Sequence, residues 1–309
     1  MVSVPVIDIT DLRSPDPELR RAVAKQIGEA CETVGFLTVT GHGIDPTVLD
    51  DAFTATRKTF AQSMDDKMAR AWDDDHVNRG YDPPGRQQLD AESAPDFKEA
   101  WSFSPEHLAG IGPMSGENQW PALADVREPI ERYHRTAMEV CEMLLRAMAL
   151  SLELDEHHFE PFHQAPICTL RLLHYPPRPD AAGEADFGAG AHTDWGAVTV
   201  LAQDGEGSLQ VMTKDGDWAD VPPVEGAFVI NVGDLLQRWT NDRYVSTLHR
   251  VIGVPGRDRY SIACFFDLDH DALIEVLPTC VTEDEPARYG PITAGGHLQE
   301  RYEASMPTG

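Results

Sequence analysis

The stretch His192-Thr193-Asp194 places an imidazole and a carboxylate two positions apart, beside the extended segment 197–204. In a strand, residues i and i+2 point to the same face, so both side chains could bind one metal ion. A third ligand is available in His249, which stands 55 residues after Asp194. Two histidines and one carboxylate can hold Fe(II) on one face and leave the opposite positions open for substrate and O2. The pattern predicts a non-haem iron site.

A second motif, Arg259-Tyr260-Ser261, begins ten residues after His249 and opens an apolar strand that runs to Phe266. An arginine and a serine at i and i+2 share one face of a strand. Together they offer a planar guanidinium fork and a hydroxyl, a combination suited to one carboxylate.

In this order and spacing, His192-x-Asp194, His249 and Arg259-x-Ser261 resemble the motifs of the iron(II)- and 2-oxoglutarate-dependent dioxygenases of the isopenicillin N synthase-like class. The resemblance covers roughly the whole chain. It includes Pro5-Val6-Ile7-Asp8, Gly35-Phe36-Leu37 through Gly41-His42-Gly43-Ile44, Asn231-Val232-Gly233-Asp234 and Trp239-Thr240-Asn241. Only the metal-binding and Arg-x-Ser motifs indicate which chemistry the protein performs.

The resemblance implies that His192, Asp194 and His249 bind Fe(II). It implies that 2-oxoglutarate fills two open iron positions and that O2 takes the last. Oxidation of an unactivated C–H bond of a small molecule would follow, with release of succinate and CO2. Hydroxylation, desaturation and ring closure all remain possible outcomes, and secondary metabolism is the expected setting.

The cosubstrate contacts are also implied by the resemblance. Arg259 would pair with the distal carboxylate of 2-oxoglutarate, and Ser261 would add a hydrogen bond. Tyr175 matches the tyrosine that helps to hold this carboxylate in the family. Leu173 departs from the pattern, because plant members of the class often have asparagine there.

Two further residues are candidates for substrate contact. If Tyr175 points into the barrel, strand alternation sends Leu173 and Arg171 inward too. A buried arginine is costly without an anionic partner, so we expect Arg171 to meet a substrate carboxylate or an internal acid. The alternative is an arginine at the barrel rim, paired with a nearby acidic residue. Phe265 shares the face of Arg259 and could pack on a substrate, although the role of an ordinary core phenylalanine is favoured.

Composition limits the classes of partner. The chain has 25 basic and 52 acidic residues, a formal net charge of −27. Phosphate backbones and anionic membrane surfaces would be repelled, so neither nucleic acid nor a membrane is an expected partner. The five cysteines are widely scattered and indicate neither a disulfide framework nor a zinc knuckle. A soluble protein in a reducing cytoplasm fits best, since no signal peptide or long apolar segment is present.

The pattern of apolar residues predicts a mainly β fold with a helical N-terminal portion. Short strands are expected at 4–9 and 36–40, and helices at 19–34, at 45–60 and within 123–154, the last starting near Pro129. Eight strands without intervening helices then suggest a jelly roll that buries a site in its mouth. They are Thr169–Tyr175, Val198–Gln203, Leu209–Thr213, Trp218–Val221, Ala227–Val232, Val251–Val254, Tyr260–Phe266 and Leu273–Leu277.

The resemblance implies the same architecture, a double-stranded β-helix core. We expect an N-terminal region over 1–165, the jelly-roll core over 166–280 and a C-terminal segment over 281–309. Loops such as 72–100 and the segment 284–309 are expected to build the substrate pocket. Their polar composition leaves the substrate open among amino acids, alkaloids, terpenoids and peptide-derived intermediates.

Two rival functions remain open on the sequence alone. The first is an iron oxidase of the isopenicillin N synthase type, which uses the same anchoring groups on its peptide substrate and needs no 2-oxoglutarate. The second is a non-catalytic jelly roll that binds a small molecule or metal. The second is disfavoured, because all three metal ligands and both anchor residues are present.

Overall fold

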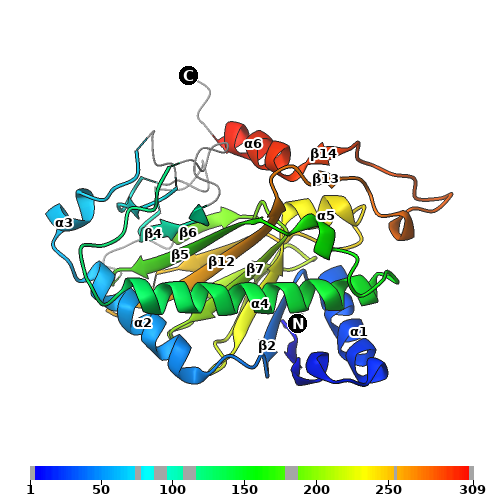
Figure 1. Ribbon diagram of the computed structural model, residues 1–309, viewed down its shortest axis with the longest axis horizontal. Coiled ribbons are helices and arrows are strands. Elements are labelled where there is room, and N and C mark those ends of the chain that lie inside the picture. The colour runs from blue at the N-terminus through cyan, green and yellow to red at the C-terminus, as the bar shows by residue number, and fades with distance from the viewer. Residues whose placement is uncertain are drawn as a thin grey trace.

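Two β-sheets pack face to face in the computed structural model, which describes residues 4–73, 78–86, 96–106, 116–177, 187–253 and 256–305 (Figure 1). The major sheet has the order β1 (Val6–Asp8), β2 (Phe36–Thr40), β10 (Phe228–Val232), β7 (Val198–Gln203), β12 (Arg259–Asp269), β5 (Pro166–Tyr175), β4 (Glu99–Phe103) and β3 (Tyr81–Asp82). The minor sheet has the order β6 (Phe187–His192), β11 (His249–Ile252), β8 (Leu209–Met212) and β9 (Trp218–Asp220). A separate hairpin pairs β13 (Leu273–Ile274) with β14 (Ile292–Thr293).

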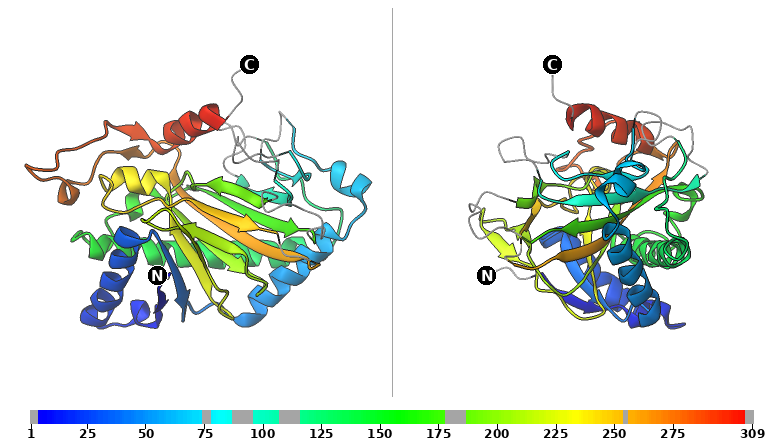
Figure 2. Two further views of the ribbon diagram at one scale, coloured as in Figure 1. Left: turned by 180° about the vertical axis from the view of Figure 1, so that it is seen from behind. Right: turned by 90° about the vertical axis from the view of Figure 1, so that its left-hand side faces the viewer.

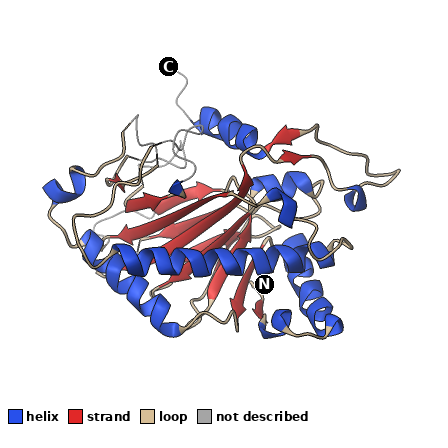
Figure 3. Cartoon of the chain, in the orientation of Figure 1, coloured by secondary structure: helices blue, strands red, loops and turns tan. Residues whose placement is uncertain are grey.

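Three long helices cover the outer face of the major sheet (Figures 1 and 3). They are α1 (Pro17–Thr33), α2 (Pro46–Phe60) and α4 (Arg127–Ser151). The first two begin after aspartate N-caps: Asp16 accepts a hydrogen bond from Glu18 N, and Asp45 accepts one from Thr47 N. The shorter helices are α3 (Met64–Met68), α5 (Asp234–Trp239) and α6 (Ala294–Ser305). Within the described ranges, no helix has the length and apolar character needed to cross a bilayer.

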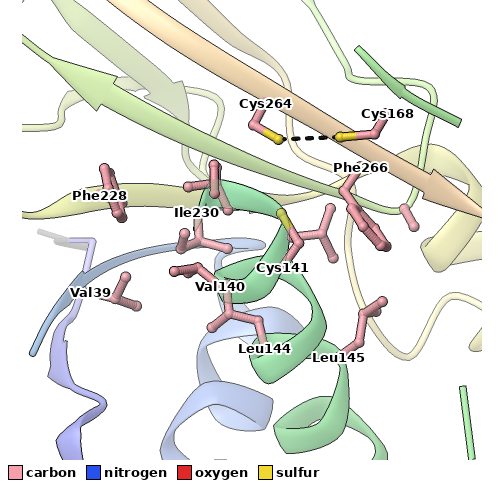
Figure 4. Close-up of a cluster of buried hydrophobic side chains, with 14 of the residues drawn as sticks. Val39, Val140, Cys141, Leu144, Leu145, Cys168, Phe228, Ile230, Cys264 and Phe266 are labelled. Carbon is pink, nitrogen blue, oxygen red and sulfur yellow. Dashed lines mark hydrogen bonds between the residues drawn. The ribbon is translucent and has the colours of Figure 1, made fainter. Parts of the chain in front are cut away.

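Strand alternation gives the major sheet two chemically different faces. On β12, Cys264 and Phe266 belong to the core that α4 covers, as Figure 4 shows. Ala263 belongs instead to a smaller cluster between the two sheets, together with Leu173 and Tyr175 of β5. The outer face therefore holds the main hydrophobic core, and the inner face is available for polar groups.

The structure confirms the jelly-roll architecture and the expected helices, and it corrects three details. Helix α5 lies between β10 and β11, so the strands are not free of intervening helices. The strand expected over Leu273–Leu277 is short and pairs only with β14, outside both main sheets. Strands β3, β4 and β6 were not predicted, because their short, glycine-rich or charged sequences lack the usual alternation.

The N-terminal region also contributes strands to the major sheet. Strand β2 lies between β1 and β10, and β4 pairs with β5 at the other end. Figure 2 shows that α1 and α2 lie against the same side of this sheet as α4. The N-terminal helices are therefore bound to the core by backbone hydrogen bonds of their neighbouring strands as well as by apolar packing.

One buried carboxylate of β12 is poorly solvated. Asp267 accepts a hydrogen bond from Leu268 N at 3.0 Å and is only 4% exposed. Burial raises its pKa to about 7, although the Leu268 N–H acts in the opposite direction. Because this folded-state pKa lies above the unfolded one, the folded protein binds the extra proton between about pH 4 and pH 7. The group's contribution to stability is therefore lost as the pH rises through 7.

We predict that Asp267→Asn stabilises the metal-free protein at pH 8 by on the order of 3 kcal/mol more than at pH 5. The amide keeps an acceptor for Leu268 N but never has to ionise in the folded state. Urea denaturation of both proteins at the two pH values measures the difference. If the substitution changes the free energy of unfolding equally at pH 5 and at pH 8, Asp267 ionises normally.

Candidate active site

The two sequence-predicted histidines face each other across neighbouring strands of the minor sheet. His192 ends β6, His249 begins β11, and their Cα atoms are direct partners in the antiparallel pairing. Their ring centroids are 4.2 Å apart. Although 57 positions separate them in the sequence, backbone hydrogen bonding therefore fixes both imidazoles at one point.

Asp194 completes the group from the turn that follows β6. Its Oδ1 lies 3.9 Å from His192 Nε2 and 3.7 Å from His249 Nε2. One donor atom from each of the three residues lies within 4.8 Å of the other two. The expectation that His192 and Asp194 share a strand face was wrong, because β6 ends at His192. The turn brings the carboxylate to the histidines instead.

This turn, residues 193–196, is held by the start of α5. Asp234 N donates to Asp194 O at 2.8 Å, and Leu235 N donates to Gly196 O at 3.1 Å. The approach is so close that a Cβ on Gly233 would lie 2.1 Å from the carbonyl oxygen of Gly196. A glycine is therefore required at 233 for steric reasons.

Helix α6 closes over the same turn. Arg301 pairs with Asp234 at 2.8 Å, and His297 Nε2 lies 3.0 Å from Trp195 O. The C-terminal segment, expected to build the pocket, thus contacts the turn that carries Asp194. Much of the other expected pocket segment, 72–100, lies outside the described residues, namely 74–77 and 87–95.

Hydrogen bonds orient both imidazoles for metal binding. His192 Nδ1 lies 2.8 Å from Gly190 O, and His249 Nδ1 lies 3.1 Å from Thr247 O. Because a carbonyl oxygen can only accept, each Nδ1 carries the proton and each Nε2 keeps its lone pair. Burial and the neighbouring His249 lower the pKa of His192 to about 3, so this ring is neutral at physiological pH. Both Nε2 atoms therefore fit a metal ion.

The ligand carboxylate is oriented in the same way. Asp194 Oδ2 accepts hydrogen bonds from Thr199 Oγ1 at 2.5 Å and from Asn231 Nδ2 at 2.7 Å. These bonds leave Oδ1 for the side where the histidines lie. Burial acts to raise the pKa of Asp194, but His249, His192 and the two hydrogen bonds hold it below its usual value. The aspartate is therefore ionised, as a metal ligand must be.

The predicted carboxylate anchor is assembled on the inner face of the major sheet. Arg259 is 1% exposed, and its cationic carbon lies 4.7 Å from the centre of the Tyr175 ring. Its Nε donates to Gly207 O at 2.8 Å, and its Nη2 donates to Gln203 Oε1 at 3.0 Å. Ser261 Oγ lies 3.4 Å from Nη1.

Among the described residues, the hydrogen-bond partners of Arg259 are all neutral groups. A buried guanidinium that is held by neutral acceptors retains an unneutralised charge, which favours an incoming anion. Tyr175 and Ser261 lie on either side of this charge, since the guanidinium lies over the Tyr175 ring and its Nη1 is 3.4 Å from Ser261 Oγ. The three side chains together can hold one carboxylate.

Charged side chains also lie on the inner face near β3 and β4. Arg171 Nη2 pairs with Asp82 Oδ2 at 2.6 Å, so it meets an internal acid. Lys98 pairs with Asp96, and Asp96 Oδ1 accepts from Gly190 N at 2.9 Å. Burial lowers the pKa of Lys98 to about 8. Because Gly190 O also orients His192, this charged group adjoins the metal ligands.

Sequence reasoning missed several of these residues. Thr199 and Asn231 were not named as supports of Asp194, although Thr199 lies on the inner face of β7 by simple alternation. Asp96 and Lys98 precede a strand that was not predicted. Phe265, a candidate for substrate contact, is partly buried against the cluster between the sheets.

Comparison with known proteins gives two family matches. Residues 4–123 match the non-haem dioxygenase in morphine synthesis N-terminal model, and residues 166–268 match the 2OG-Fe(II) oxygenase superfamily model. A 2-oxoglutarate-Fe(II) type oxidoreductase, hxnY of Emericella nidulans, is 36% identical over 97% of this chain and 90% of its own length. The 2-oxoglutarate-dependent dioxygenase citB of Monascus ruber is 37% identical over 89% of this chain and 87% of its own.

This chain belongs to the Fe(II)- and 2-oxoglutarate-dependent oxygenase superfamily.

Solved structures agree with this assignment. A full-length protein of Neurospora crassa, solved in complex with alpha-KG, superposes with a TM-score of 0.89 and 32% identity, covering 98% of this chain and 96% of that one. The same protein has been solved with alpha-KG and thymine, with a TM-score of 0.88 and 31% identity. The oxygenase uses Fe(II) and O2, with 2-oxoglutarate as cosubstrate. Membership of this family favours a 2-oxoglutarate-dependent reaction over the 2-oxoglutarate-independent oxidase considered above.

We predict that Asn231→Leu lowers the affinity of the oxygenase for Fe(II) roughly 10- to 100-fold. The change removes one of two donors to Asp194 Oδ2 while keeping the number and branching of side-chain heavy atoms, so the carboxylate loses part of its orientation. Calorimetric titration with Fe(II) under anaerobic conditions measures the effect. Thr199→Val should give a loss of similar size, since Thr199 binds the same oxygen. Undiminished affinity in both variants would exclude an orienting role.

Proposed function

We propose that His192 Nε2, Asp194 Oδ1 and His249 Nε2 bind the Fe(II) of this oxygenase. The observation that carries the proposal is their geometry: both Nε2 atoms lie within 3.9 Å of the same carboxylate oxygen, and both rings are oriented by backbone carbonyls. One metal ion with bond lengths of about 2.0–2.2 Å can bind all three atoms if each histidine nitrogen moves less than about 1 Å closer to Asp194 Oδ1. Two neutral imidazoles and one carboxylate would leave the ion with a net charge near +1.

We further propose that Arg259, Ser261 and Tyr175 bind the distal carboxylate of 2-oxoglutarate. The support is the buried charge of Arg259, with the Ser261 hydroxyl and the Tyr175 ring beside it. Gly207 O and Gln203 Oε1 hold the guanidinium from behind, so it is preorganised before the anion arrives.

The iron supplies oxidative decarboxylation of the 2-oxo acid and, through O2, oxidation of a substrate C–H bond. The protein's own groups do the positioning. The rigid pairing of β6 with β11 sets the ligand spacing, while Thr199 and Asn231 hold the carboxylate. The apolar residues between the sheets, including Val211 and Val251, exclude water from the interior.

Replacement of the anchor tests this assignment. We predict that Arg259→Leu raises the dissociation constant of 2-oxoglutarate roughly 10- to 100-fold, because a charge-assisted hydrogen bond is lost. Anaerobic titration of the Fe(II)-loaded protein, followed by visible charge-transfer absorption, measures binding directly. Arg257→Leu is the matched control, since Arg257 is 69% exposed and lies two positions away. Equal effects in the two variants would contradict the proposal.

We propose that the substrate is a small molecule recognised beside Arg171 and Phe265. Arg171 Nε is buried and without a hydrogen-bond partner among the described residues, so it retains a donor for a ligand, whereas Asp82 Oδ1 lies 4.0 Å from Arg86 Nε. A structural relative, the Neurospora crassa protein, has been solved with the small molecule thymine together with alpha-KG. The partly buried Phe265 offers an apolar surface on the same face of the sheet.

For Arg171→Leu, we predict that the KM of the organic substrate rises at least about 10-fold, while substrate-independent formation of succinate is unchanged. We expect the two quantities to respond differently because Arg171 contacts neither the metal ligands nor Arg259. Steady-state assays of succinate, with and without substrate, provide both values. Arg20→Leu is a control that removes a distant arginine paired with Glu156. Unchanged KM and turnover in Arg171→Leu would eliminate the substrate role.

The expected division of the chain is retained as part of this proposal. Residues 166–280 would form the jelly-roll core that carries the chemistry, with 1–165 and 281–309 as flanking segments. A cytoplasmic setting is supported by the five cysteines, which are all free thiols. The relatives from Emericella and Monascus are fungal, and a role in secondary metabolism would be in keeping with the resemblance noted above.

A further inference from the structure

A second group of potential metal ligands lies on the other side of the major sheet. Cys168 of β5 and Cys264 of β12 are neighbours on its outer face, and α4 lies over them with Cys141 and His134. His134 and Cys141 are seven positions apart, two helical turns, and so lie on one face of α4. Figure 4 shows the sulfur of Cys141 directed from the helix toward Cys264. Cys141 therefore lies near the pair formed by Cys168 and Cys264, although it does not belong to the group whose donor atoms all lie within 4.8 Å of one another.

The donor atoms are close enough to share an ion. Cys168 Sγ lies 3.4 Å from Cys264 Sγ, and His134 Nε2 lies 3.2 Å from Cys168 Sγ. One donor atom each of His134, Cys168 and Cys264 lies within 4.8 Å of the other two. All three cysteines are fully buried, whereas His134 is only half-buried and offers a route of entry from solvent.

The spacing fits zinc. With Zn–S bonds of about 2.3 Å and a Zn–N bond of about 2.05 Å, both measured separations would subtend about 95° at the ion. Widening each pair by a few tenths of an ångström would reach the tetrahedral angle. Three thiolates and one imidazole are a common ligand set of structural zinc sites. Sulfur ligands also favour Zn²⁺ over hard cations such as Mg²⁺.

We propose that His134, Cys168 and Cys264, with Cys141 as the fourth ligand, form a structural zinc site that ties α4 to the outer face of the major sheet. This site is separate from the iron ligands. Arg171 and Ala263, neighbours of Cys168 and Cys264 on the same two strands, face the opposite side, between the sheets. Zinc here would stabilise the packing of α4 without touching substrate or cosubstrate.

Cobalt provides the direct test. The full-length His192→Ala protein, in which the iron ligands cannot compete, is reduced and titrated anaerobically with Co²⁺. We expect one equivalent to produce near-ultraviolet thiolate-to-Co²⁺ charge transfer and the strong visible bands of tetrahedral cobalt, and Zn²⁺ to abolish both. The His192-Asp194-His249 group has no sulfur and cannot give the charge-transfer band. Absence of that band at stoichiometric Co²⁺ would overturn the proposal.

Substitutions of the proposed zinc ligands show which residues bind the metal. In the same His192→Ala background, Cys264→Ala and His134→Ala should each weaken Co²⁺ binding at least about 100-fold. Cys31→Ala should leave the bands unchanged, because Cys31 is an equally buried cysteine on α1 outside the group. If Cys264→Ala does not fold, the half-buried His134 still gives a decisive result. Unchanged bands in His134→Ala, or a Cys168–Cys264 disulfide in the reduced preparation, would overturn the assignment.

Discussion

The direct pairing of His192 with His249 across β6 and β11 is the constraint on which the iron site depends. Backbone hydrogen bonds between these strands set the distance between the imidazoles before any metal arrives. The third ligand is positioned differently, by a turn whose carbonyls accept from the first residues of α5. Since Gly233 meets Gly196 without room for a side chain, the turn, the helix and the strand pair form one rigid unit.

The major sheet separates two environments with opposite requirements. Its inner face carries Arg259, Ser261 and Arg171. Buried groups of this kind require a bound anion or an acidic side chain as partner. Its outer face carries apolar residues and thiols beneath α4. Because adjacent residues of β5 and β12 alternate between the faces, a single strand supplies both the chemistry and the core. A register shift of one residue would exchange them and destroy both.

The sequence predicted the chemistry better than it predicted the geometry. His192, Asp194, His249 and Arg259 could be named because residue type and order carry the signal, but Asp194 reaches the site from a turn and not from a strand. Contacts such as Asn231 with Asp194 could not be derived, since they depend on the register between distant strands. The meeting of Cys168 with Cys264 was hidden for the same reason: 96 positions separate them, and no local spacing marks the pair.

We propose that three side chains converge on one ferrous ion beside a preformed carboxylate anchor. A crystal structure of the oxygenase with Fe(II) and 2-oxoglutarate, grown without O2, measures this most directly. We expect His192 Nε2, Asp194 Oδ1 and His249 Nε2 at about 2.0–2.2 Å from the metal, and the distal carboxylate of 2-oxoglutarate against Arg259. A metal ion without His249 among its ligands, or a cosubstrate carboxylate bound away from Arg259, would contradict it.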